Sequence, residues 1–242
     1  MKALKDNHNQ KKKIRTINPS TEKANEEYPI VEKEDIENRV KKARNSFVEW
    51  KKDYDSRANF LYAFAEGFDK ESESLARIAT NEMGKTIKES RSEVTKCSWA
   101  IKYFADSGKN FLSDEVINTD ARKSFVSFEP LGVVASLMPW NFPYWQALRF
   151  AAPSLMAGNT VILKLSSNTM QCGIEIEKLF EQIGLPTGVF QTIIATYEEA
   201  EALIDSGGVK CCHIYWQYPC WGQSCTKSNI PNKENRSGAG GK

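Results

Sequence analysis

Val133-Val134-Ala135-Ser136-Leu137-Met138-Pro139-Trp140-Asn141-Phe142-Pro143 is the stretch that decides the fold of this chain. Its first six residues are almost continuously apolar, as in a short strand that is buried on both faces of a parallel sheet. Its last five residues combine two prolines with an asparagine, a composition typical of a turn. A helix is expected to follow at residues 144–157, and Gly158 is placed to end it. The stretch therefore predicts one strand–turn–helix unit.

Two further units of the same kind follow along the chain. Strands are expected at residues 160–164 and 190–194, and helices at residues 170–183 and 198–205. Three successive strand–helix units imply a parallel, doubly wound α/β sheet of the Rossmann-like kind. The sequence contains no Gly-x-Gly-x-x-Gly, the common dinucleotide-binding fingerprint of such sheets.

The region before this sheet is expected to be mainly helical. Residues 1–15 are polar and lysine-rich, and we expect them to form a flexible arm. Apolar residues then recur at helical spacing, which predicts helices over about residues 35–50, 56–83 and 87–106. Residues 115–130 alternate between apolar and polar around a polar turn, which indicates a β-hairpin.

The composition is that of an ordinary globular protein. Hydrophobic residues make up 40% and charged residues 26% of the 242 residues, and 33 basic against 31 acidic side chains give a formal net charge of +2. This even balance argues against nucleic-acid and membrane partners. No apolar run approaches the roughly 20 residues that cross a bilayer. The lysine-rich start lacks the apolar core of a signal peptide, so a cytoplasmic location is expected.

Three side chains are expected at the carboxyl ends of the strands, where sheets of this class bind ligands. Asn141 follows the first strand, and taken alone it is a candidate for capping the next helix. Taken alone, Trp140 is a candidate core residue. Lys164 ends the second strand, and taken alone it is a candidate for a solvated lysine. Position alone therefore leaves these structural roles open.

Several motifs are shared with one enzyme superfamily. They are Asn18-Pro19-Ser20-Thr21, Glu82-Met83-Gly84-Lys85, Pro130-Leu131-Gly132-Val133-Val134, Met138-Pro139-Trp140-Asn141-Phe142-Pro143, Ala152-Pro153-Ser154-Leu155-Met156-Ala157-Gly158-Asn159-Thr160-Val161-Ile162-Leu163-Lys164 and Gly184-Leu185-Pro186-Thr187-Gly188-Val189-Phe190. On these motifs, residues 16–210 resemble the aldehyde dehydrogenase superfamily. The turn motif continued through Gln146, with Arg149-Phe150-Ala151-Ala152-Pro153 after it, is most similar to the succinate-semialdehyde dehydrogenase-like branch.

This resemblance implies NAD(P)-dependent oxidation of an aldehyde, with succinate semialdehyde as the expected substrate, to the carboxylic acid. In that family a cysteine attacks the aldehyde, hydride passes to NAD(P), and water releases the acid. Asn141 matches the family's oxyanion donor, a side-chain amide that faces the developing negative charge. Intact relatives form homo-oligomers, and residues 115–130 match part of the family's oligomerisation region.

The resemblance also implies which residues bind the cofactor. The turn residues expected to line the NAD(P) cleft are Met138, Pro139 and Trp140. Lys164 matches the lysine that binds the adenosine ribose hydroxyls. Ser166 and Ser167 follow it, and NAD-preferring relatives place a carboxylate near the second position, where it repels a 2′-phosphate. Ser167 has no charge, so we expect NADP to be accepted as well as NAD.

Residues 211–242 do not continue the strand–helix pattern. They hold four of the six cysteines, so a disulfide is one alternative. A zinc site is another, and its ligands would be Cys211, Cys212, His213, Cys220 and Cys225. The spacing of these residues is not that of paired zinc ligands. Read one nucleotide later, the codons can encode Phe-Thr-Gly-Ser and later Leu-Glu-Leu-Gly-Gly, two hallmarks of the family in the family's order. Trp216 and Trp221 then each become glycine. The hypothesis is that residues 211–242 are a frameshifted, disordered tail that holds no metal.

On this hypothesis the chain contains neither the family's nucleophilic cysteine nor its general-base glutamate. Cys97 and Cys172 occupy apolar helical positions and are expected to be small core residues. We therefore expect a catalytically inactive chain, with a sheet that is incomplete at its C-terminal side and has an unpaired edge. The alternatives are a non-catalytic, pseudogene-like fragment, a remnant that binds cofactor, and a regulatory zinc-binding tail.

Overall fold

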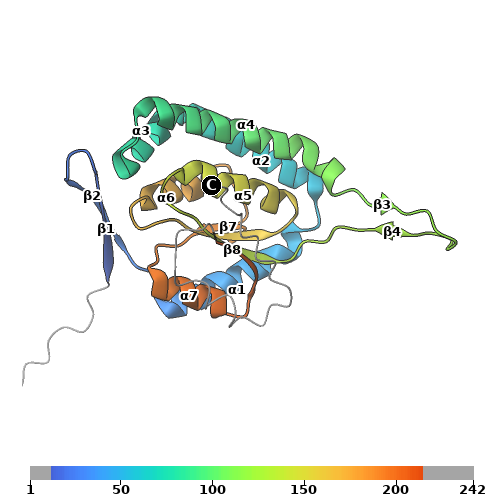
Figure 1. The fold of residues 1–242 in the computed structure, drawn as a ribbon. Coiled ribbons are helices and arrows are strands. Elements are labelled where there is room, and N and C mark those ends of the chain that lie inside the picture. The colour runs from blue at the N-terminus through green and yellow to red at the C-terminus, as the bar shows by residue number, and fades with distance from the viewer. Residues whose placement is uncertain (1–11, 215–242) are drawn as a thin grey trace, which may run out of the picture.

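The computed structural model describes residues 12–214, and its centre is a parallel sheet between two layers of helices (Figure 1). The helices are α1 (Lys33–Trp50), α2 (Tyr54–Lys70), α3 (Ser72–Met83), α4 (Ile87–Phe111), α5 (Pro143–Met156), α6 (Met170–Gln182) and α7 (Tyr197–Asp205). The strands are β1 (Lys13–Ile17), β2 (Ala24–Pro29), β3 (Glu115–Val116), β4 (Phe125–Val126), β5 (Val133–Leu137), β6 (Thr160–Lys164), β7 (Phe190–Thr192) and β8 (Val209–Ile214).

The central sheet has four parallel strands in the order β7-β6-β5-β8. Helices α1 and α7 lie on one face, and α5 and α6 lie on the other (Figure 1). Helices α2 and α4 form a further layer over α5. Because helices cover both faces, the middle strands β5 and β6 are buried along their whole length. This arrangement confirms the predicted doubly wound α/β sheet.

Alternate residues of β5 belong to two different cores. Val133, Ala135 and Leu137 pack with residues of α1 and α7. Val134 packs into the larger core, to which α2, α3, α4, α5 and α6 contribute. A strand points successive side chains to opposite faces, so a strand covered on both faces has a continuous apolar sequence.

The helical layer departs from the prediction in one place. The helix expected at residues 56–83 is two helices, α2 and α3, which are separated at Glu71. The backbone of Glu71, with φ −90° and ψ 10°, leaves the helical conformation. Both helices bury apolar faces in the same core, so the apolar spacing continues across the break and conceals it. Helix α3 ends at Gly84 as predicted, with a left-handed φ of 85°.

Two antiparallel hairpins extend from the body. In the first, β1 pairs with β2, and Arg15 forms an ion pair with Glu27 across the strands. Residues 13–15 therefore belong to a strand and not to the predicted flexible arm, because their backbone pairs with β2. In the second, β3 pairs with β4 inside the hairpin predicted at residues 115–130. This hairpin projects away from the sheet (Figure 1).

Strand β8 corrects the predicted boundary at residue 210. Cys211, Cys212, His213 and Ile214 continue the parallel ladder with β5, and all four are half-buried. Backbone groups make the ladder, and cysteine and isoleucine suit a half-buried strand, so the pairing tolerates this sequence. The rest of the predicted tail, from residue 215, lies outside the described residues, and the frameshift stays a hypothesis.

Candidate active site

The predicted site residues gather at the carboxyl ends of β5 and β6. Leu137 and Lys164 are partners in the parallel ladder, and Met138 donates its backbone N–H to the Lys164 carbonyl at 2.9 Å. Met138, Pro139 and Lys164 are buried, whereas Trp140 is 40% exposed. Trp140 is therefore not a core residue. The turn after β5 lies beside the end of β6, as the predicted sheet requires.

Asn141 lies in the turn between β5 and α5, where it lines a cavity of about 770 Å³. Its side-chain oxygen is buried and accepts no hydrogen bond from the described residues. Helix α5 has Phe142 as its N-cap and no side-chain cap from that residue, so Asn141 does not cap the helix. The capping interpretation is wrong. A buried amide oxygen without an internal donor is instead available to accept a hydrogen bond from a ligand or an ordered water.

Helices α4 and α5 contribute most of the cavity wall. The cavity is lined by Thr86, Lys88, Glu89, Ser92, Glu93, Lys96, Asn141, Phe142, Trp145, Gln146 and Arg149. Trp145 and Arg149 are four residues apart on α5, and Gln146 and Arg149 three apart, so they share one helical face. That spacing is the signal by which Gln146 and Arg149 could have been found. In the sequence these two residues were assigned only to the family motif and not to a site.

A buried ion pair stands at the N-terminus of α5. One carboxylate oxygen of Glu93 accepts the backbone N–H of Trp145 at 2.9 Å, and the other pairs with the ammonium of Lys85. The side chains of Lys85 and Glu93 are 6% and 1% exposed. Burial lowers the pKa of Lys85 below its ordinary value. The Glu93 carboxylate lies at the N-terminus of α5, which is the positive end of the helix dipole.

Glu82 makes a similar contact with the next helix. Its carboxylate accepts the backbone N–H groups of Gln171 and Cys172, each at 3.1 Å, at the start of α6. Glu82 is buried, and this burial raises its pKa to about 7, although the two backbone donors oppose the shift. Both helices that begin at the candidate site are therefore capped by carboxylates from the α3–α4 region.

Lys164 is enclosed at the end of β6. It is 4% exposed, its ammonium lies 5.7 Å from the ring centroid of Tyr197, and the Glu199 carboxylate acts on it electrostatically. Burial lowers the pKa of Lys164 to about 8, and the Glu199 carboxylate opposes this shift. The alternative of a solvated lysine is wrong. Glu199 also accepts the Thr196 N–H at 2.8 Å, and the Thr-x-x-Glu capping pattern could have indicated its position.

Ser166 and Ser167 follow Lys164 in the loop before α6. Ser166 is half-buried, and its carbonyl accepts the N–H of Thr169 at 3.0 Å. Ser167 is exposed. The loop at residues 165–169, which directly follows Lys164, contains no aspartate or glutamate. This loop therefore brings no negative charge to the end of β6.

The cysteines of the described region lie away from the cavity. Cys97 and Cys172 are fully buried, and burial raises the pKa of both thiols, which disfavours the reactive thiolate. They are core residues, as expected. Cys211 and Cys212 lie on β8. Within residues 12–214 no cluster of three or more histidine, cysteine or acidic side chains is placed to hold a metal. Cys220 and Cys225 of the zinc alternative lie outside these residues.

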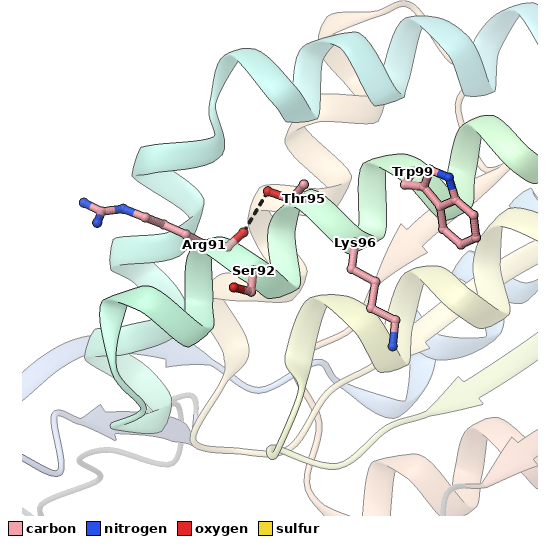
Figure 2. Close-up of a pocket in the computed structure, with 5 residues that line it drawn as sticks. All are labelled: Arg91, Ser92, Thr95, Lys96 and Trp99. Carbon is pink, nitrogen blue, oxygen red and sulfur yellow. Dashed lines mark hydrogen bonds between the residues drawn. The ribbon is translucent and has the colours of Figure 1, made fainter.

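A second, more open hollow of about 550 Å³ runs along α4, and Figure 2 shows its lining residues. They all come from this one helix: Arg91, Ser92, Thr95, Lys96 and Trp99. Lys96 points toward α5, where its ammonium lies 3.8 Å from the Trp145 ring centroid. Lys96 thus borders both hollows. Asn141 lines only the first, so the first is the candidate site.

Known sequences give one consistent result. Residues 6–214 match the profile of the Aldehyde dehydrogenase family. A Synechocystis sp. protein described as a probable NADP(+) succinate-semialdehyde dehydrogenase is 37% identical over 192 residues, which cover 79% of this chain and 42% of that protein. An aldehyde dehydrogenase of Paenarthrobacter nicotinovorans is 36% identical over 81% of this chain and 44% of its own length. The match through residue 214 agrees with the extent of β8.

Solved structures agree with the sequences. A succinic semialdehyde dehydrogenase from Streptococcus pyogenes, solved with NADP+, has a TM-score of 0.79 and 25% identity over 82% of this chain and 44% of its own. An aldehyde dehydrogenase from Brucella melitensis biovar abortus has a TM-score of 0.80 and 27% identity over 83% of this chain and 42% of its own. The chain thus spans less than half of the length of these relatives. None of the helices within residues 12–214 combines the length and the hydrophobicity that a membrane-spanning segment needs.

Proposed function

Because the chain belongs to the aldehyde dehydrogenase family, we propose that it carries the oxyanion-binding and cofactor-binding part of an NAD(P)-dependent aldehyde oxidation. The observation that carries this proposal is the position of Asn141, which lines the cavity and whose side-chain oxygen is held neither by the helix start nor by another described residue. When a thiolate adds to an aldehyde carbon, the carbonyl oxygen becomes an oxyanion. The amide N–H groups of Asn141 donate to that oxygen and stabilise its charge.

The cofactor has a fitting set of residues at the same edge of the sheet. Bound NAD(P) supplies the hydride acceptor. Lys164, a buried donor at the carboxyl end of β6, binds the adenosine ribose hydroxyls, and Ser166 and Ser167 extend this contact. The side of the cofactor cleft is formed by Met138, Pro139 and Trp140. Since no carboxylate lies at 165–169, the loop accepts the 2′-phosphate of NADP as well as the hydroxyl of NAD.

The substrate we propose is succinate semialdehyde, an aldehyde with a carboxylate at its far end. Arg149 lines the same cavity as Asn141. A guanidinium binds a carboxylate through two parallel hydrogen bonds. With the aldehyde oxygen on Asn141, Arg149 holds the distal carboxylate. Two of the relatives above carry this substrate in their names.

We infer that the attacking thiolate does not come from the described residues. Cys97 and Cys172 are buried with raised thiol pKa values, and no cysteine lines the cavity within residues 12–214. This observation favours the second candidate function, a non-catalytic chain that binds cofactor.

We further propose that the β3–β4 hairpin contributes to a homo-oligomer, since its apolar residues Val116, Phe125 and Val126 are exposed.

Two measurements on the purified chain test these proposals. Titration with NADP+ and NAD+ is expected to show saturable binding of both cofactors. An assay with succinate semialdehyde and either cofactor is expected to show no reduced cofactor, because no described cysteine lines the cavity and the thiols of Cys97 and Cys172 are buried with raised pKa values. Turnover that is lost in Cys97→Ser or Cys172→Ser would show that a buried cysteine is the nucleophile, and absence of cofactor binding would remove the cofactor role.

A further inference from the structure

Helix α5 cannot satisfy its own N-terminus. Its N-cap, Phe142, has no side-chain acceptor, its first residue is Pro143, and its first turn contains no acidic residue. The backbone N–H groups of a first helical turn have no partners within the helix. An acceptor must therefore come from another element or from solvent.

Glu93 of α4 provides this acceptor. Its carboxylate accepts the Trp145 N–H at 2.9 Å, although the two residues are 52 positions apart in the sequence. The same carboxylate forms the buried ion pair with Lys85. The Lys85 ammonium lies 5.1 Å from the ring centroid of Phe142. The pair thus touches α5 at Trp145 and at Phe142, the residue that directly follows Asn141.

We propose that Glu93, paired with Lys85, is a positioning residue that fixes the turn carrying Asn141 through its contact with the first turn of α5. Within residues 12–214 no donor bonds to the buried side-chain oxygen of Asn141, so no hydrogen bond at that oxygen fixes the amide, and the backbone of the turn helps to set its direction. Charge-assisted hydrogen bonds are roughly twice as strong as neutral ones. A buried, paired carboxylate therefore holds this turn more firmly than a neutral cap.

The effect of this positioning on catalysis rests on the proposed oxyanion role of Asn141. The contact itself is tested by NMR of the full chain, without turnover. Two quantities are measured: the hydrogen exchange rate of the Trp145 backbone amide, and the chemical shifts and line widths of the two Asn141 side-chain amide protons. The test variant is Glu93→Gln. The matched control is Glu82→Gln, because Glu82 is equally buried and caps α6 in place of α5.

In Glu93→Gln we expect Trp145 exchange to accelerate about tenfold, from the loss of charge in the hydrogen bond. The Asn141 amide signals are expected to shift and broaden. In Glu82→Gln neither quantity should change. Should Glu93→Gln not fold, the double variant Glu93→Gln, Lys85→Met removes both charges and is expected to give the same two changes.

Three outcomes would overturn the proposal. Asn141 signals that stay unchanged while Trp145 exchange accelerates would show a cap with no positioning effect. Unchanged Trp145 exchange would show that the carboxylate does not hold the helix. Equal Asn141 changes in both variants would show general loosening. Failure of the oxyanion role would instead leave these NMR results intact and appear only in an activity assay.

Discussion

Glu93 of α4 accepts the backbone N–H of Trp145 at 2.9 Å, and so a carboxylate from one helix caps the helix that follows the Asn141 turn. This relationship joins α4 to α5 at the candidate site. The same carboxylate is 1% exposed and paired with Lys85. Its removal therefore has consequences for the stability of the fold as well as for the site.

Glu93→Ala is expected to lower the free energy of unfolding by about 3–5 kcal/mol, because Lys85 remains buried without its partner. Urea denaturation followed by circular dichroism measures this change. The control is Glu73→Ala, which breaks exposed ion pairs with Arg77 and Arg91; exposed pairs contribute about 0–1 kcal/mol. Equal losses in the two variants would contradict the account of the buried pair.

Glu82 is expected to make stability depend on pH. Burial raises its pKa from an ordinary 4.5 to about 7, so the folded chain binds a proton that the unfolded chain has released. The unfolding free energy should therefore fall as pH rises from 4.5 to 7, by about 3 kcal/mol. Glu82→Gln, which has no carboxylate, should lack this decline. Denaturation curves across that range test it, and parallel pH profiles for the two proteins would refute it.

Sequence motifs identified the turn and the strand ends but not what holds them. Asn141 follows an apolar strand and Lys164 ends another, and local patterns suffice to place them. Glu93 and Trp145 are 52 positions apart, and Glu82 and Cys172 are 90 apart. Such contacts depend on how α3 and α4 pack on α5 and α6, and no local sequence pattern predicts this packing. The β8 boundary was missed because a parallel ladder is made by backbone groups, whatever the side chains.

Lys164→Met is expected to weaken binding of NADP+ about tenfold to hundredfold, through loss of a charged hydrogen-bond donor. In the unsubstituted chain, affinity should also decline as pH rises through about 8, where Lys164 loses its proton. Calorimetric titration at several pH values measures both effects. Lys178→Met, at an exposed position of α6, serves as the control. An affinity that is independent of Lys164 would exclude the ribose contact.

Ser167→Glu is expected to shift cofactor preference toward NAD. The new carboxylate would lie in the loop after Lys164 and repel the 2′-phosphate of NADP, while the uncharged hydroxyl of NAD is less affected. The ratio of the dissociation constants for NADP+ and NAD+ should rise about tenfold. Ser113→Glu adds the same charge outside the site. A ratio that is equal in both variants would show that Ser167 does not face the 2′-position.

The central claim, that Asn141 is the oxyanion donor, is tested most directly by the kcat of an active chimera. In it, residues 16–214 replace the matched segment of the Synechocystis relative. Asn141→Ala in this chimera should lower kcat for succinate semialdehyde about 10²–10³-fold, with cofactor affinity unchanged, while Asn110→Ala at an exposed position of α4 leaves kcat as it was. A chimera whose kcat is the same with and without the Asn141 amide would contradict the account.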